Sequence, residues 1–153
     1  MKQRSAGILA YRFVNDLIEV LLVHPGGPFW KYKDEGAWSI PKGEYDDQEN
    51  VLSAAKREFG EETGHTIKEE KFIPLTSIKQ KSGKWVDAFA IEYDLDVASV
   101  KSNVFEIEWP PRSGRMQSFP EVDRAGWFTI DTARTKILAA QMPLLDELSR
   151  LLK

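Results

Sequence analysis

The chain has 153 residues, enough for one compact domain with its own core and too few for two ordinary domains. Hydrophobic residues make up 42% and charged residues 29%, as in ordinary globular proteins, so disordered and fibrous classes are excluded. The net charge of -3 gives no bulk indication of a nucleic-acid or membrane partner, and the absence of cysteine excludes disulfide scaffolds and thiol nucleophiles. Since no long apolar run occurs, we expect neither a secretory signal nor a membrane span, and a cytoplasmic location.

The chain starts with two β-rich runs, residues 8–13 and 17–24, on either side of Asn15 and Asp16. Because this pair tolerates turn conformations, the pattern predicts a β-hairpin. A loop rich in glycine, proline and aromatic residues is expected over residues 25–36.

The hydrophobic period then changes and predicts a helix at about residues 47–63. Asp46 and Glu49 match a capping box at its start, and Gly64 matches a stop at its end. The apolar stripe that would face the core consists of Leu52, Ala55 and Phe59.

Three strand-like runs follow the helix, at residues 72–79, 85–93 and 104–109. A polar loop is expected at 110–120 and a short strand around 127–128. The tail has helical spacing from a predicted N-cap at Asp131, and Pro143 should break or kink it. Because strands and helices alternate within one core, we expect a single mixed α/β domain spanning residues 1–153.

The predicted helix carries Glu58, Glu61 and Glu62 within one sector of its surface. Like charges at this spacing repel one another, and they lie near the helix C-terminus, where the helix dipole disfavours anions. Arg57 can neutralise one of them, whereas a divalent cation such as Mg²⁺ can neutralise several. The cluster on its own favours a solvated acidic helix surface over a metal site.

The sequence around the cluster resembles the Nudix box of the Nudix hydrolase superfamily. The match begins at Gly43, and Glu49 follows after five intervening residues. Seven further residues separate Glu49 from the pair Arg57-Glu58, which an apolar residue and one variable residue follow. The motif then continues with Glu61-Glu62, one variable residue and Gly64. One position departs from the pattern, since His65 stands where an aliphatic residue is usual. The resemblance implies the family's α/β/α sandwich, with a mixed β-sheet between helices, and the order of the predicted elements fits it.

The resemblance also implies a hydrolase that uses divalent metal to cleave a pyrophosphate bond in a nucleoside diphosphate derivative. Glu58, Glu61 and Glu62, with the backbone carbonyl of Gly43, would then hold Mg²⁺, or alternatively Mn²⁺. Arg57 would orient a carboxylate through a charge-assisted pair. A metal ion neutralises charge that develops on phosphate oxygens and lowers the pKa of bound water, which suits this reaction.

Some members of the family carry a further glutamate, six residues before a tryptophan of the last strand, as a metal ligand or general base. Glu121 precedes Trp127 by that spacing. Glu121 is equally readable as an ordinary loop acid, and Glu106 and Glu108 are weaker rivals for the same role.

Four further residues are candidates for substrate binding. Lys42 lies next to the box and is placed to meet a phosphate. Lys81 and Lys84, near a predicted turn, provide either a second phosphate contact or solubilising charge. Trp30, in the aromatic loop, either stacks on a base or packs over the core.

The Trp-x-x-Pro-Lys-Gly segment before the box and residues 119–128 resemble the diadenosine tetraphosphate hydrolases and the diphosphoinositol polyphosphate phosphatases. They favour a (di)nucleoside polyphosphate as substrate. The alternatives are a house-cleaning (d)NTP pyrophosphatase and a nucleotide-binding Nudix module without hydrolysis. We expect a small-molecule nucleotide as partner and neither stable nucleic-acid nor membrane binding. The sequence does not indicate an oligomeric state.

Overall fold

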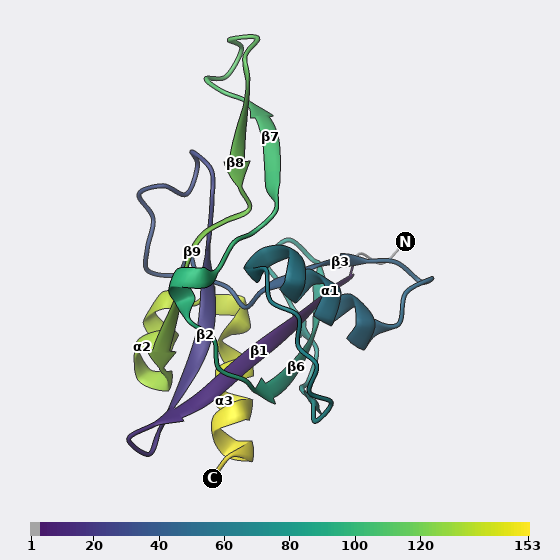
Figure 1. Ribbon diagram of the computed structural model, residues 1–153, viewed down its shortest axis with the longest axis vertical. Coiled ribbons are helices and arrows are strands. Elements are labelled where there is room, and N and C mark those ends of the chain that lie inside the picture. The colour runs from purple at the N-terminus through teal and green to yellow at the C-terminus, as the bar shows by residue number, and fades with distance from the viewer. Residues whose placement is uncertain (1–3) are drawn as a thin grey trace.

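A computed structural model describes residues 4–153 of the protein (Figure 1). The strands of this range are β1 (Arg4–Val14), β2 (Leu17–Pro25), β3 (Lys42–Tyr45), β4 (Ile73–Pro74), β5 (Ile78–Lys79), β6 (Trp85–Glu92), β7 (Val104–Glu108), β8 (Met116–Pro120) and β9 (Val122–Thr129). Its helices are α1 (Val51–Thr63), α2 (Ile130–Lys136) and α3 (Met142–Leu151), with short 3₁₀ turns at Val97–Ser99 and Ala139–Gln141. No helix in this range has both the length and the apolar composition needed to cross a membrane.

The described residues contain one mixed sheet with the strand order β4-β6-β1-β2-β9, in which β3 also pairs with β1 and β5 with β6. Only the β1–β6 pair is parallel, and the other pairs of this sheet are antiparallel. Strands β7 and β8 form a separate two-stranded ribbon. The prediction of a mixed sheet is confirmed.

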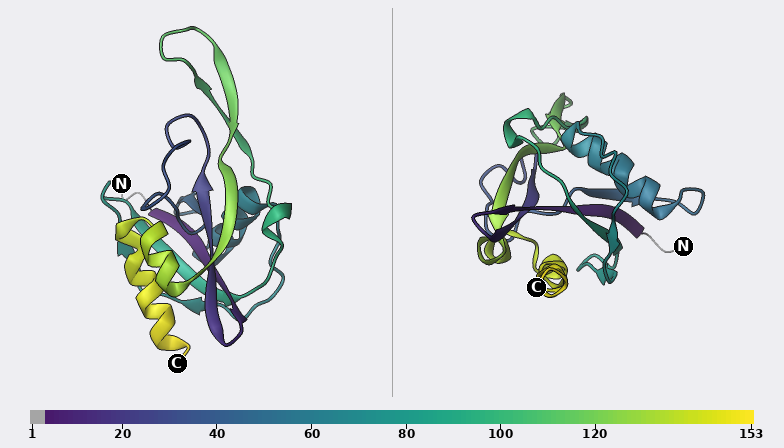
Figure 2. Two further views of the ribbon diagram at one scale, coloured as in Figure 1. Left: turned by 90° about the vertical axis from the view of Figure 1, so that its left-hand side faces the viewer. Right: turned by 60° about the horizontal axis from the view of Figure 1, so that its bottom comes forward.

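Helices cover both faces of the sheet, with α1 on one side and α2 and α3 on the other (Figure 2). Because side chains alternate along a strand, β1 supplies both cores: Leu9 packs on the side of α3, and Ile8 packs on the side of α1. Phe59 of α1 lies in the second core. The predicted α/β/α sandwich is therefore confirmed.

The β1–β2 connection is a two-residue turn. Asn15 and Asp16 have φ angles of 51° and 65°, which a tight hairpin turn requires of both residues. The hairpin expected from the sequence is confirmed, with longer strands than the apolar runs indicated.

Helix α1 begins later than predicted, at Val51. Asn50 is its N-cap and accepts hydrogen bonds from two backbone N–H groups of the first turn. The prediction of a cap at Asp46 is wrong, because its carboxylate accepts the N–H of Gln48 in the preceding turn. Gly64 ends the helix as predicted, with φ 79° and its N–H donating to a carbonyl of the last turn.

The C-terminal part of the chain differs from the prediction at two places. The second half of the expected polar loop is strand β8, which pairs with β7. The tail helix is capped by Thr129 rather than Asp131, and the chain leaves the helical conformation at Ile137, ahead of Pro143. Pro143 lies in the first turn of α3, where its missing N–H has no consequence.

The β7–β8 ribbon, residues 104–120, projects from the body as an arm (Figure 1). The loop after β2 lies beside it: the rings of Phe29 and Trp109 meet edge to face at 5.2 Å, and Gly27 lies against the ring of Phe105. A two-stranded ribbon is marginally stable alone, so this loop supports the arm.

Candidate active site

The C-terminal half of α1 presents its glutamates to the segment that precedes the helix. One nitrogen of Arg57, Nη1, donates to Glu58 at 2.7 Å and to Glu61 at 2.8 Å. Its Nε and Nη2 hold both oxygens of Glu49, at 2.7 and 2.9 Å. These bonds, led by the bond to Glu49, raise the pKa of Arg57. Arg57 thus joins the pre-helix loop to two box glutamates.

Glu58 lies against strand β3. A Cβ atom at Gly43 would overlap the Glu58 carboxylate, so only glycine allows this close approach. Burial raises the pKa of Glu58 and the neighbouring Glu61 adds to the effect, while Arg57 partly offsets both.

Glu62 turns toward the chain entering β3. Its carboxylate accepts the backbone N–H of Lys42 at 3.2 Å. Burial raises the pKa of Glu62 to about 8, with repulsion from Glu58 and Glu121 adding to the effect and Lys42 opposing it. Burial also lowers the pKa of Lys42, against the attraction of Glu62. The two side chains form a poorly solvated pair of opposite formal charge.

A cavity of about 210 Å³ opens beside this pair. It brings together residues that the sequence separates widely, since Lys42, Glu62, Glu121 and Trp30 all line it. Its remaining walls are mainly apolar: Val23, Pro25, Ala37, Ser39, Val122 and Leu138. The cavity therefore combines a charged side with a hydrophobic interior, as small-molecule sites commonly do.

Main-chain hydrogen bonds hold Glu121 near the end of α1. The N–H of Lys101 donates to the carbonyl of Thr63 at 2.9 Å, and that of Asn103 donates to the carbonyl of Glu61 at 2.8 Å. The N–H of Glu121 donates in turn to the carbonyl of Asn103 at 2.9 Å. These bonds satisfy carbonyls at the helix C-terminus and fix the base of the arm against the helix.

A family model described as the NUDIX domain matches residues 1–148. The chain belongs to this family. It carries the glutamates of the box together with the fold, and it is a Nudix pyrophosphohydrolase by class.

Solved Nudix structures share the fold. The NUDIX domain of Shewanella oneidensis NrtR, in complex with ADP ribose, superposes with a TM-score of 0.70 at 14% identity, over 100% of this chain and 90% of that chain. A binary complex of C. elegans Ap4A hydrolase gives 0.64 at 24% identity, over 98% and 97%. A mutT/nudix family protein from Listeria innocua gives 0.61 at 17% identity, over 98% and 93%.

The two other candidate lysines of this Nudix domain lie outside the cavity. Lys84 pairs with Glu44 of β3 at 2.8 Å, on the strand that also carries Lys42. Lys81 is exposed in the turn between β5 and β6 and does not line the cavity.

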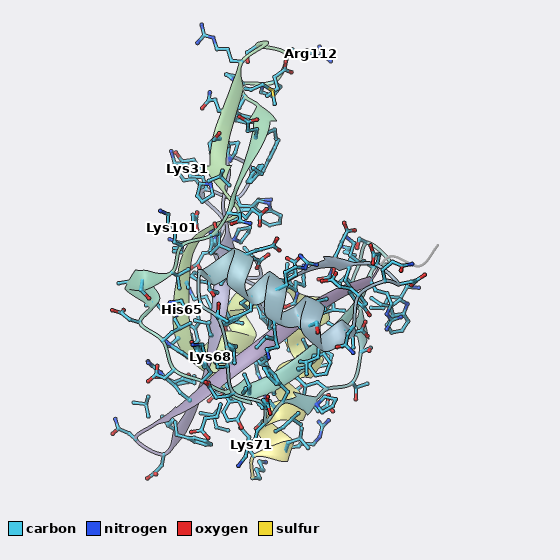
Figure 3. The ribbon with its side chains drawn as sticks, turned by 45° about the vertical axis from the view of Figure 1, so that its right-hand side comes forward. Lys31, His65, Lys68, Lys71, Lys101 and Arg112 are labelled. Atoms are coloured by element: carbon cyan, nitrogen blue, oxygen red, sulfur yellow. The ribbon has the colours of Figure 1, made fainter. Side chains whose placement is uncertain are left out.

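The two rivals of Glu121 lie on the arm. Glu106 is exposed on β7. Glu108 accepts the N–H groups of Arg112 and Gly114, both at 3.1 Å, and so holds the turn at the tip of the arm, where Figure 3 labels Arg112. Neither lines the cavity that Glu121 lines.

Nudix hydrolases generally use divalent metals, and the carboxylates here fit one. Across residues 4–153 no three acidic or histidine side chains converge in a ready-made metal site. Arg57 holds Glu58 and Glu61, whereas Glu62 turns to Lys42. The donors are nevertheless all hard oxygens. Burial raises the pKa of both Glu58 and Glu62, repulsion from neighbouring carboxylates adds to the rise, and a divalent cation relieves that repulsion.

Asp87 of β6, which no pattern in the sequence indicated, contacts the end of β3. Its carboxylate accepts from Arg4 at 2.6 and 2.8 Å, from Tyr45 at 2.6 Å and from Ser77 at 2.5 Å. Tyr45 ends the strand that contains Gly43, so this carboxylate helps to place the main chain beside the box glutamates.

Proposed function

We propose that this Nudix protein is a Mg²⁺-dependent hydrolase that cleaves a phosphoanhydride bond in a (di)nucleoside polyphosphate. The observation that carries the proposal is the cavity in which Lys42, Glu62 and Glu121 meet. A lysine beside several carboxylates suits a substrate with phosphates that are bound jointly by a cation and an ammonium group.

Each residue of the site has a separate task in this proposal. Glu58, Glu61 and Glu62, with the carbonyl of Gly43, hold the divalent cation, which when bound stabilises charge on phosphate oxygens and activates water. Arg57 keeps two of these carboxylates in place through the bonds at 2.7 and 2.8 Å.

The cavity beside Glu62 binds the rest of the substrate. Lys42 donates to a phosphate oxygen, and its partly buried position strengthens that contact because little water competes. Glu121 supplies one more carboxylate to the cation from the base of the arm. Trp30 provides an aromatic wall on which a base can stack. Lys84 pairs with Glu44 and does not line the cavity, so we assign it no contact with substrate inside the cavity.

The choice of substrate rests on the box-flanking segments and agrees with the fold neighbours. One neighbour is an Ap4A hydrolase, and another binds ADP ribose. Mononucleoside triphosphates and binding without hydrolysis are the competing possibilities, and one experiment separates them.

The experiment incubates purified protein with Mg²⁺ or Mn²⁺ and a panel of diadenosine tetraphosphate, nucleoside triphosphates, ADP-ribose and diphosphoinositol phosphates. Products are identified by chromatography and mass. We expect diadenosine tetraphosphate to yield ATP and AMP, and Glu62→Gln to lower kcat at least about 100-fold with an unchanged circular dichroism spectrum. Glu69→Gln, at an exposed loop position outside the cavity, is the matched control and should keep the wild-type rate.

Two results would contradict the proposal. Absence of turnover across the panel with both metals, combined with nucleotide binding, would identify a binding module. A wild-type rate in Glu62→Gln would remove this residue from the metal site.

A further inference from the structure

A fully buried histidine lies immediately behind the cavity. His24 has no exposed surface, whereas its chain neighbours Val23 and Pro25 line the cavity. Its Nδ1 lies 2.8 Å from Oδ1 of Asp123, and its Nε2 lies 2.6 Å from the carbonyl oxygen of Lys33. A carboxylate and a carbonyl only accept hydrogen bonds, so each ring nitrogen faces an acceptor. The ring is a buried imidazole held between two fixed acceptors.

Asp123 reaches the ring because strand β9 is irregular there. In the β2–β9 ladder His24 pairs with Arg124 and Pro25 pairs with Val122, so Asp123 is an extra residue on β9. Such a bulge redirects a side chain and is common beside active sites. The bulge turns Asp123 toward the His24 ring. Asp123 lies two residues after Glu121.

The second acceptor, the carbonyl of Lys33, belongs to the loop after β2. This loop carries Trp30 and forms one wall of the cavity. The N–H of Lys33 donates to the carbonyl of Trp30 at 3.0 Å, so the bond from His24 to Lys33 holds the turn that carries Trp30. Trp38 packs edge to face on the imidazole at 5.2 Å and donates its Nε1–H to Asp34 of the same loop at 2.8 Å.

We propose that His24 and Asp123 are a positioning pair that sets the separation of the two cavity walls, Trp30 on one side and Glu121 on the other. The His24 ring bonds to both walls at once, through the main chain of the loop and through the bulge of β9. This role rests on the proposed function for its catalytic consequence, but the geometry of the pair does not depend on it.

The first test examines the contact between His24 and Asp123 by NMR and needs no enzymatic assay. The chain has only two histidines, so a tag-free His65→Gln variant leaves His24 as its sole imidazole. Figure 3 places His65 beside the end of α1, where its ring meets Ser99. In long-range ¹H–¹⁵N spectra of this variant, adding Asp123→Ala should shift the Nδ1 resonance of His24, which lies 2.8 Å from the Asp123 carboxylate. An unchanged Nδ1 resonance would overturn the proposal.

The same spectra report on the two cavity walls, through the indole N–H of Trp30 and the amide of Glu121. Asp123→Ala removes one acceptor from the ring and is at a partly exposed position, so the variant should fold. We expect it to shift both the Trp30 indole N–H and the Glu121 amide, whereas Asp123→Asn, which keeps an acceptor oxygen, should shift them less. Unchanged resonances in Asp123→Ala would contradict the coupling of the two walls.

The catalytic test uses the same variants. We expect Asp123→Ala to lower kcat/KM about 10- to 100-fold, mainly through KM, with Asp123→Asn recovering most of the loss and His65→Gln resembling wild type. A role in stability alone would lower Tm and leave KM unchanged well below Tm, and that result would overturn the proposal. If the wild-type protein cleaves nothing, the proposed function fails while the spectra still decide on the pair.

Discussion

The partly buried carboxylate of Asp87 allows a quantitative prediction, because four hydrogen bonds converge on it. Arg4 donates two of them, and Tyr45 and Ser77 donate one each. The Asp87 side chain is 14% exposed. Replacing Asp87 by asparagine keeps its size but removes the charge that these donors face.

The magnitude follows from the pKa. Burial by itself raises the pKa of Asp87, but the bonds from Arg4, Ser77 and Tyr45 outweigh it and hold the pKa at about 2, below the ordinary 3.8. Each pH unit of that difference is worth about 1.4 kcal/mol, so the ionised network contributes about 2 kcal/mol to the free energy of unfolding. We expect Asp87→Asn to lose about this amount at pH 7.

The lowered pKa of Asp87 fixes the direction in which its contribution to the free energy of unfolding changes with pH. The unfolded chain takes up the proton near pH 3.8 and the folded one near pH 2. The contribution is therefore complete above pH 3.8 and disappears as the pH falls toward 2. The difference between Asp87→Asn and wild type should shrink over that window.

The assay is urea unfolding followed by tryptophan fluorescence at pH 7 and at several values down to pH 2.5. With a slope of about 2 kcal/mol per M, the midpoint at pH 7 should fall by about 1 M. The matched control is Asp94→Asn, which removes a carboxylate that pairs with Arg12 at 3.0 Å but is 69% exposed. An exposed pair of this kind contributes less than about 1 kcal/mol. The reasoning is refuted if Asp87→Asn loses no more than the control, or loses equally at pH 7 and pH 2.5.

Three further substitutions test local features. Asn50→Ala removes the cap of α1 and should destabilise the protein by about 1 kcal/mol in urea unfolding, with a smaller effect from Asp46→Ala; equal effects would contradict the cap assignment. Gly64→Ala, at φ 79° and with a Cβ 2.9 Å from the carbonyl oxygen of Lys101, should cost at least about 1 kcal/mol in the same assay. Gly43→Ala should displace the flexible end of the Glu58 side chain, so kcat should fall at least about 10-fold while Tm changes little; a wild-type kcat would show that this contact has no role.

Short sequence patterns predicted those turns and helix ends whose conformation depends on neighbouring residues alone. The hairpin turn at Asn15 and Asp16 and the stop at Gly64 follow from backbone conformations that few residues adopt. The predicted start of α1 was wrong because Asp46 and Asn50 are both residue types that cap helices well. Which of them caps α1 depends on how the chain leaves β3. Strand β8 was missed because its side chains are mostly polar or exposed and its pairing partner is another exposed strand.

In the candidate site, too, helix geometry predicts some of the residue positions, whereas others depend on the packing of distant segments. The box spacing predicts that Glu58, Glu61 and Glu62 share a helix surface, because helical geometry alone places them there. The meeting of Lys42 and Glu121 in one cavity depends on the packing of β9 against β2, which no local pattern contains. His24 and Asp123 are 99 positions apart and meet only through a bulge, so nothing in the sequence joined them.

The base of the arm is joined to the catalytic helix through the main chain. The bonds that run from Glu61 through Asn103 to Glu121 use only N–H and carbonyl groups, which every residue except proline provides in full. Substitutions along the arm, or changes in its length, can therefore accumulate without moving Glu121 relative to the box. Relatives of this chain are therefore free to change the arm while the box glutamates and Glu121 keep their relative positions. An engineer could exchange residues 104–120 as a cassette without disturbing the box.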